Sequence, residues 1–463
     1  MPVRADARSA KRVNVVVIGA GLAGLNAAVN LEDQGAAVLL LEAQPRPGGR
    51  LRTLRTADGA LECGATTVGP EYGRIRALAD RFTVPLVKPQ GFSGMAWHIH
   101  DKLGKPGTWE SAPQNRTVGF ERSIGPAVLE PAAIKRFTKL ASAADWRDPA
   151  FAKWDIPADR FYRECGLSDE AIRLIEITSN CESLATTSAL FQMKEIQSIA
   201  TWGRAGGQAN SVYDAGNDSH SIGGGSDRLP EAIARGLKSE VQYSTPVTSI
   251  DMNARGCEVR TAAGQRIACD YVVSAIPFSA LSRIMISPVP TGVRGESIHK
   301  SLYMGTSHFF FAVTKPYWEQ DGADPGMITD GSIERVFANR DAGGEATLLD
   351  VWINGAGVRA FDRMDRNAAV VAVTAELYRL RPSMRGAIRF IESYSWGNNP
   401  FVTGNKHIFQ PGQVTRFAAQ MAEPWHRLHF AGEHTRDIEP GMEAAAATGE
   451  RAAFEILAKL GIA

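Results

Sequence analysis

A glycine-rich turn near the start of the chain has the spacing of a loop that binds a diphosphate. The run Gly19-Ala20-Gly21-Leu22-Ala23-Gly24 follows an apolar, β-branched segment and opens a helical pattern. In such a loop, Gly19 permits the tight turn, Gly21 lets the backbone approach a pyrophosphate, and Gly24 lets helix and strand pack closely. The N–H groups at the start of the helix attract phosphate oxygens. The run therefore predicts a dinucleotide site; the alternative is a glycine-rich turn in an unrelated α/β domain.

Glu42 and a second glycine pair supply other groups that a dinucleotide needs. Glu42 ends the next apolar run, where its carboxylate would accept hydrogen bonds from both ribose hydroxyls and repel a 2′-phosphate. In Pro47-Gly48-Gly49-Arg50-Leu51, the arginine could reach the same pyrophosphate in a bidentate way. This second turn favours FAD over NAD; the alternative is a surface turn with a solvated arginine.

The elements expected around these residues form a strand, a helix and a second strand. The strands are predicted at residues 13–18 and 38–41, with the helix between them. A different, mixed pattern covers 86–220, and α/β patterns return twice after it. One domain assembled from separated pieces explains this order. The later elements are expected at 228–238, 241–243, 247–251, 257–260, 270–275, 299–313, 348–353, 363–380, 428–431 and 442–459.

Composition and charge exclude several classes of partner. The chain has 463 residues, with 51 Lys and Arg against 50 Asp and Glu, so nucleic acid and anionic membranes are not expected partners. No stretch approaches the roughly 18 apolar residues of a membrane span, and residues 1–12 lack the apolar core of a secretory signal. Five cysteines without a CxxC pair favour a reduced, cytoplasmic protein. The histidines lack partners in register, so no metal is expected.

Motif blocks over nearly the whole chain resemble the flavin-containing amine oxidases of the monoamine oxidase type. The blocks occur in the family's order and spacing, which is more specific than any single motif. Besides the two glycine turns and Glu42, they are Glu62-Cys63-Gly64-Ala65, Val68-Gly69-Pro70 and the residues at 223–229, 273–277, 430–434, 441–444 and 449–453.

The resemblance implies an α/β fold with two domains. A Rossmann-like FAD-binding domain would comprise residues 12–85, 220–290 and 420–463. A discontinuous α+β substrate domain of mixed sheet and helices would comprise residues 86–219 and 291–419.

The resemblance also implies a set of residues that hold FAD. Glu433 would contact the ribityl side of the flavin, and the backbone of Met442 would lie by its pyrimidine edge. Asn405 stands where monoamine oxidases carry a flavin-linked cysteine, and because asparagine cannot form a thioether, the FAD is expected to be non-covalent. The implied set is Gly19, Gly21, Ala23, Gly24, Glu42, Gly49, Arg50, Leu51, Ala65, Thr66, Val247, Glu433 and Met442.

The implied chemistry is oxidation of the C–N bond of a small amine, with or without an anionic or polar group. A hydride would leave the carbon beside the nitrogen for flavin N5, and the imine would hydrolyse. Oxygen or a redox protein would accept the electrons, and a homodimer is one expected assembly. Two alternatives stay open: a flavin desaturase or dehydrogenase acting on a C–C bond, and a flavin-bound assembly partner without turnover.

The predicted substrate contacts depart from the family's pattern. Counting from Trp396 and Glu433 places Lys406 and Gly441 where many members have two aromatic rings flanking the amine. Lys406 could bind a substrate carboxylate, repel an ammonium or be a solvated loop residue. A one-residue gap could also hide a nearby ring such as Phe409. Trp396, Lys406 and Gly441 are the predicted substrate-binding residues.

His308 is the predicted catalytic residue. It stands where the family usually has a lysine that holds a water at flavin N5 and aids the reaction with oxygen. A histidine could hold that water and carry a proton near neutral pH. The alternative is a structural histidine beside the apolar run Phe309-Phe310-Phe311.

Overall fold

The chain begins with the predicted strand–helix–strand unit. In the computed structural model, which describes residues 13–462 apart from 90, 92–93, 106 and 204–218, β1 (Val13–Ile18) pairs in parallel with β2 (Val38–Leu41). The helix α1 (Leu22–Asp33) connects them. The central valines of β1 are fully buried because helices and neighbouring strands cover both of its faces. The expectation for residues 1–12 lies outside the described residues.

The first sheet brings the predicted nucleotide motifs to one edge. Its strands β2, β1, β13 and β22 run parallel, so their carboxyl ends meet. Gly19, Glu42, Ala275 and Ala431 directly follow these four strands, and ligands of open α/β sheets bind at this edge. In spatial order the sheet contains β10 (Val241–Gln242), β2, β1, β13 (Arg266–Ser274), β12 (Gly256–Thr261), β11 (Val247–Asn253) and β14 (Met285–Ser287), with β22 (Leu428–Phe430) also on β13.

The second sheet has one apolar face and one face that carries polar side chains. Phe309 and Val351 point into a core covered by α11 (Gly355–Asp362) and α12 (Arg366–Leu380), whereas His308 and Asp350 alternate onto the opposite face. The spatial order is β20 (Ile388–Ser395), β16 (Thr306–Val313), β19 (Ala346–Asn354), β18 (Arg335–Arg340), β17 (Gly326–Thr329), β7 (Met95–Ile99) and β8 (Lys102–Gly104).

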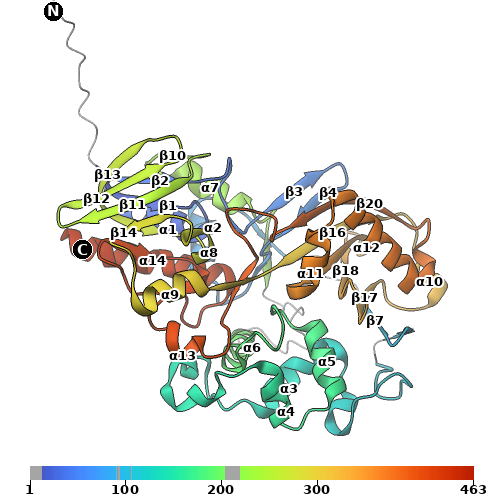
Figure 1. Ribbon diagram of the computed structural model, residues 1–463. Helices are drawn as coiled ribbons and strands as arrows, with labels where there is room; N and C mark the ends of the chain where they lie inside the picture. Colours follow the sequence, from blue (N-terminus) through green and yellow to red (C-terminus); the bar gives the residue numbers. More distant parts are fainter. Residues whose placement is uncertain (1–12, 90, 92–93, 106, 204–218, 463) are drawn as a thin grey trace, which may run out of the picture.

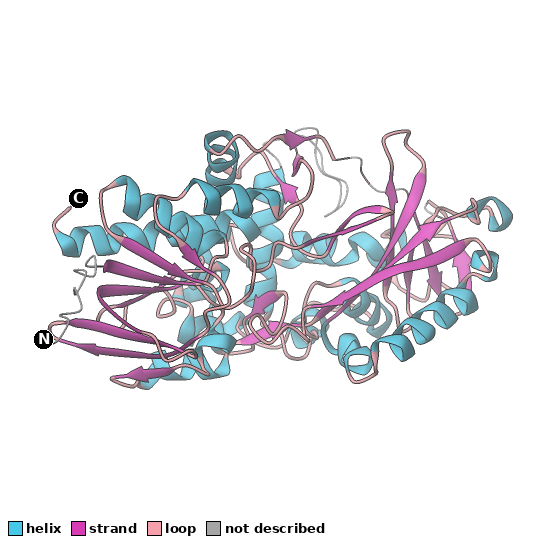
Figure 2. Ribbon diagram, turned by 90° about the horizontal axis from the view of Figure 1, so that it is seen from above, coloured by secondary structure: helices cyan, strands magenta, loops and turns pink. Residues whose placement is uncertain are grey.

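Helices and small sheets join the two large sheets. Figure 1 shows the first sheet above α1 and α14 (Gly441–Leu460), the second sheet on the other side, and α3–α6 below. Seen from above, the sheets occupy opposite ends of an elongated molecule (Figure 2). The small sheets contain β3 (Thr53–Thr56) with β4 (Gly59–Glu62), β5 (Thr67–Val68) and β6 (Leu86–Val87) with β9 (His220–Ile222), and β15 (Leu302–Met304) with β21 (Lys406–Ile408).

The remaining helices are mostly short. None of the helices in the described ranges is long and apolar enough to cross a membrane. They are α2 (Gly73–Arg81), α3 (Leu129–Phe137), α4 (Ala158–Glu164), α5 (Asp169–Thr178), α6 (Ala189–Gly203), α7 (Arg228–Gly236), α8 (Phe278–Leu281), α9 (Gly292–Lys300), α10 (Trp318–Asp321) and α13 (Gln413–Phe417).

Candidate active site

One cavity extends from the carboxyl edge of the first sheet to the polar face of the second. Its volume is about 1350 Å³, larger than the roughly 300–1,000 Å³ of a typical small-molecule pocket. Gly19 and Glu42 line one end, and His308 and Trp352 line the other. A single space therefore connects the nucleotide motifs with the predicted catalytic residue.

The glycine turn leaves room for a ligand beside the start of α1. Gly19 has a φ of +101°, and a Cβ atom added there would lie 2.7 Å from Ile276. A Cβ on Gly24 would lie 1.9 Å from the carbonyl oxygen of Gly19, so Gly24 serves helix–strand packing and lies outside the cavity lining. Gly21 lines the cavity, and a Cβ there would meet nothing within 4 Å. The helix start it precedes has no side-chain cap among the described residues, so backbone N–H groups are available for an anion.

Glu42 is held by two backbone N–H groups at the cavity wall. Its Oε2 accepts a hydrogen bond from the N–H of Ala20 at 2.7 Å, and its Oε1 accepts one from the N–H of Gln44 at 2.8 Å. Burial raises the pKa of Glu42, while these two hydrogen bonds oppose the rise. Each oxygen keeps a further lone pair, which suits the two hydroxyls of a ribose.

Arg50 is ordered by an ion pair and is not a solvated surface residue. Its Nη1 donates to Glu433 Oε2 and to the carbonyl oxygen of Asn405, both at 3.0 Å. Glu433 also accepts a hydrogen bond from Arg436. Burial alone would raise the pKa of Glu433, but Arg436 and Arg50 lower it to about 2. Arg46 instead closes the second glycine turn through the carbonyl oxygens of residues 47, 49 and 51.

A second helix start faces the same cavity. The helix α14 begins at Gly441, and both Gly441 and Met442 line the cavity. A Cβ on Gly449 would lie 2.1 Å from the carbonyl oxygen of Ala23, so this glycine lets α14 pack directly on α1. Two helix N-termini and a ribose acceptor are what a flavin dinucleotide requires from its protein. The predicted cofactor residues along the cavity are Gly19, Gly21, Ala23, Glu42, Gly49, Arg50, Leu51, Ala65, Thr66, Val247, Glu433 and Met442.

His308 and Asp350 form a buried pair at the other end. Nδ1 of His308 lies 3.0 and 3.1 Å from the two carboxylate oxygens of Asp350 on the neighbouring strand. The imidazole stacks against the rings of Phe310 and Trp352, at centroid distances of 5.8 and 5.4 Å. Within the described chain, Nε2 has no hydrogen-bond partner, and the residue lines the cavity. The pair therefore presents one oriented ring nitrogen to a ligand.

Lys406 lies on β21 and is ion-paired, so the solvated-loop alternative is wrong. Its Nζ is 2.6 Å from Oε2 of Glu195 on α6, and its side chain is 26% exposed. Both residues line the cavity. Phe409 is 1% exposed and packs against Trp146 and Phe191 in the core, so it does not replace a missing ring at the cavity wall.

Trp396 lies in the core behind Cys63, which lines the cavity. Its side chain is fully buried, packs with Cys63 and Phe310, and donates a hydrogen bond from its indole N–H to the carbonyl oxygen of Cys63. Trp396 is outside the cavity lining, because its indole packs in this core and its N–H is already hydrogen-bonded. Trp396 is therefore not a substrate contact.

A model of the flavin containing amine oxidoreductase family matches residues 22–457. This chain belongs to that family. Flavin-containing amine oxidase B of Homo sapiens is 25% identical over 97% of this chain and 87% of its own. The L-amino acid oxidase of Bothriechis schlegelii is 23% identical over 96% of this chain and 90% of its own. Cyclohexylamine oxidase from Brevibacterium oxydans matches with a TM-score of 0.79 and 19% identity, covering 97% of this chain and all of that chain.

Family membership confirms the predicted fold and makes the chain an amine-oxidising flavoenzyme. The α/β prediction agrees with the first sheet and with the solved amine oxidases. The limits given above for the FAD-binding and substrate domains stay a prediction.

Sequence reasoning missed the partners of two candidate residues. Asp350 is a charged residue inside the apolar run Leu348-Leu349-Asp350-Val351, which was a usable signal. Glu195 on α6, which pairs with Lys406 and with Arg436, had no such signal in the sequence. It meets Lys406 only because α6 packs beside β21.

Proposed function

We propose that this flavoenzyme binds FAD non-covalently and oxidises a small amine at the carbon next to its nitrogen. The observation that supports this most directly is the single cavity that connects Glu42 and the start of α1 with His308 and Asp350. When bound, the flavin supplies the hydride acceptor for the C–N bond. The remaining tasks belong to the chain: positioning the amine, excluding water and removing a proton.

His308 removes the proton in this proposal. An amine is mostly an ammonium ion at neutral pH and must be neutral before its carbon gives up a hydride. Nε2 of His308 accepts the proton from the ammonium, which leaves a neutral amine and an imidazolium. Asp350 stabilises that imidazolium through Nδ1–H. Asp350 is thus a positioning residue, and its carboxylate also attracts the ammonium to this end of the cavity.

Anaerobic reduction of the holoenzyme tests the proposed reaction. A panel of primary amines is expected to bleach the flavin absorbance, whereas matched alcohols and alkanes with activated C–C bonds are not. Bleaching by the C–C donors alone would favour the desaturase, and no bleaching by any donor would favour a non-catalytic partner. Readmission of oxygen then separates an oxidase from a dehydrogenase, because only an oxidase recovers its colour rapidly. The cytoplasmic location and the homodimer stay predictions.

A further inference from the structure

Several cations surround one carboxylate at the cavity wall formed by α6 and β21. Oε2 of Glu195 lies 2.6 Å from Nζ of Lys406. Its Oε1 lies 3.0 Å from Nζ of Lys194 and 3.2 Å from Nη2 of Arg436. Burial alone would raise the pKa of Glu195, but these three cations hold that pKa well below its usual range. Glu195 is therefore ionised and already fully engaged.

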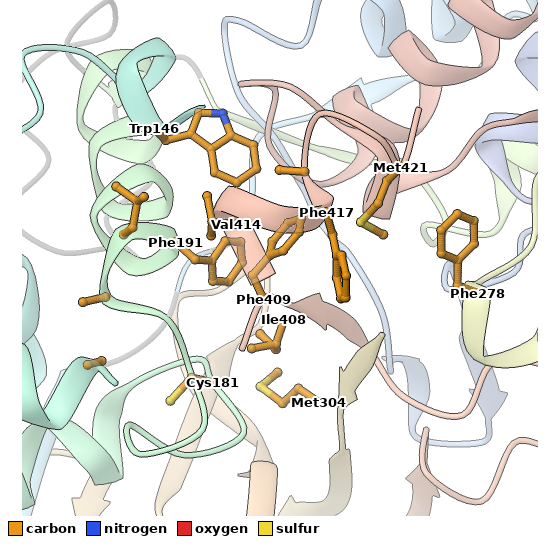
Figure 3. Close-up of a cluster of buried hydrophobic side chains, with 14 of the residues drawn as sticks. Trp146, Cys181, Phe191, Phe278, Met304, Ile408, Phe409, Val414, Phe417 and Met421 are labelled. Carbon is orange, nitrogen blue, oxygen red and sulfur yellow. The ribbon is translucent and has the colours of Figure 1, made fainter. Parts of the chain in front are cut away.

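An aromatic core holds this cationic cluster (Glu195, Lys194, Lys406 and Arg436) in place. Figure 3 shows Phe191 and Phe409 packed together, with Trp146 above and Ile408 and Met304 below. Nζ of Lys406 lies 5.5 Å from the centroid of the Phe191 ring, and the Arg436 guanidinium carbon lies 5.2 Å from it. The cluster thus has little freedom to rearrange, and its charges are fixed before a ligand arrives.

The cationic cluster carries more positive than negative charge. Arg436 is shared with Glu433, which also binds Arg50. Even if Arg436 is assigned wholly to Glu433, Glu195 faces two lysines and can balance one. Burial lowers the pKa of Lys194 to about 8, so that lysine is mostly charged at pH 7. The cationic cluster therefore keeps a net positive charge, which the buried carboxyl of Glu130, also in electrostatic contact with Lys406, offsets only in part because burial raises its pKa to about 7.

The exposed member of the cationic cluster faces the cavity. The side chain of Lys194 is fully buried and that of Arg436 is 2% exposed, whereas that of Lys406 is 26% exposed. The ammonium of Lys406 has three N–H donors, and Glu195 is its hydrogen-bonding partner within the described ranges. Donors are thus left for a ligand. A second ammonium brought here would meet net repulsion, whereas an anion would meet net attraction.

We propose that Lys406 and the cationic cluster behind it form an anion subsite, and that the substrate is an amine carrying a carboxylate or similar anionic group at its far end. This inference rests on the proposed amine oxidation and names its substrate class. The ammonium lies toward Asp350 and His308, and the anion lies on Lys406.

The fold sets an upper limit to the distance between the two groups. Lys406 pairs with Met304 on β15, and His308 is four residues farther along the chain on β16. At about 3.3 Å per residue along the chain, plus about 5 Å between paired residues on neighbouring strands, the Cα atoms of Lys406 and His308 are separated by at most about 18 Å. The spacer between the anionic and amino groups is accordingly an aliphatic or aromatic one that spans less than this distance.

Calorimetric titration of the purified holoenzyme with a non-oxidisable pair of probes tests the subsite. Phenylbutyrate carries the anion, and phenylbutanol is its neutral match. In the unchanged protein, phenylbutyrate is expected to bind at least tenfold tighter than phenylbutanol, and added salt is expected to reduce the difference. Lys406→Met should abolish most of this preference, and Lys406→Arg should keep it. Lys300→Met, which removes a lysine paired with Glu296 on α9, should leave both affinities unchanged.

Glu195→Gln tests the sign of the charge independently of side-chain shape. Removing the carboxylate frees Lys406 from its ion pair, so phenylbutyrate should bind more tightly while phenylbutanol stays the same, even though the buried Lys194 loses the anion that raises its pKa. Equal binding of the two probes, or a preference that survives Lys406→Met, would overturn the subsite. These binding measurements do not require turnover, so a failure of amines to bleach the flavin would count against the proposed reaction and not against the subsite.

Discussion

Replacing His308 with alanine is expected to slow the reduction of the flavin by an amine about a hundredfold at neutral pH. The variant loses the imidazole that lines the cavity and pairs with Asp350, and a positioned general base contributes roughly 10²–10⁴-fold to a rate. Anaerobic stopped-flow mixing measures the rate of bleaching directly. The loss should shrink as the pH rises, because a larger share of the free amine is then already neutral.

The chain contains a matched control for this substitution. His429 is also buried and also pairs through Nδ1 with a carboxylate, Glu455, at 2.7 Å, but it lies outside the cavity lining. His429→Ala should leave the reduction rate close to that of the unchanged enzyme once folding has been verified. Equal rates for His308→Ala and the unchanged enzyme would make His308 a structural residue.

Asp350→Asn separates positioning from packing, since the side chain keeps its shape and loses its charge. Without the carboxylate, the imidazolium that forms when Nε2 accepts a proton loses its stabilising partner, and the ring loses the contact that orients it. The rate of flavin reduction by an amine should therefore fall about tenfold. A purely structural Asp350 would lower protein stability without lowering this rate.

Replacing Glu42 with alanine is expected to weaken FAD binding about a hundredfold. The ribose hydroxyls would lose a charged acceptor, and two such hydrogen bonds at about 1.5 kcal/mol each amount to about 3 kcal/mol, or roughly two decades in Kd. The apoprotein is prepared by mild unfolding and refolding, and its fluorescence is followed during titration with FAD.

Glu32 provides the control for Glu42. It is a buried carboxylate that accepts backbone hydrogen bonds from the N–H groups of Lys238 and Ser239, both at 2.8 Å, and it lies outside the cavity lining. Glu32→Ala should therefore destabilise the fold by a similar amount and leave the Kd for FAD unchanged. An unaltered Kd in Glu42→Ala would contradict the assignment of the ribose to this residue.

The local elements could be predicted because their signals are local. The β-branched run of β1, the glycines of the turn and the Ala-rich α14 each determine their own conformation, and the predicted limits of β1 and β2 match the structure. The order of parallel strands then places Gly19 and Glu42 at one edge without further information. The cofactor end of the cavity follows from these local patterns.

The substrate end could not be predicted in the same way because it depends on long-range packing. Lys406 meets Glu195 only because the aromatic core around Phe191 places α6 beside β21, and no spacing in the sequence encodes that contact. Trp396 was misplaced for the same reason: motif counting gives its position along the chain, but the depth of its indole behind Cys63 is set by the packing of β4, β16 and β20.

Release of the cofactor from purified protein tests the central claim most directly. The claim is that the turn at Gly19 and the carboxylate of Glu42 hold the adenosine diphosphate part of a flavin that is not covalently attached. After acid precipitation of yellow protein, the account predicts that the flavin appears in the supernatant, has the mass of FAD and is present at about one molecule per chain. Folded, colourless protein that takes up no FAD would contradict the account, and flavin that stays in the pellet would contradict its non-covalent attachment.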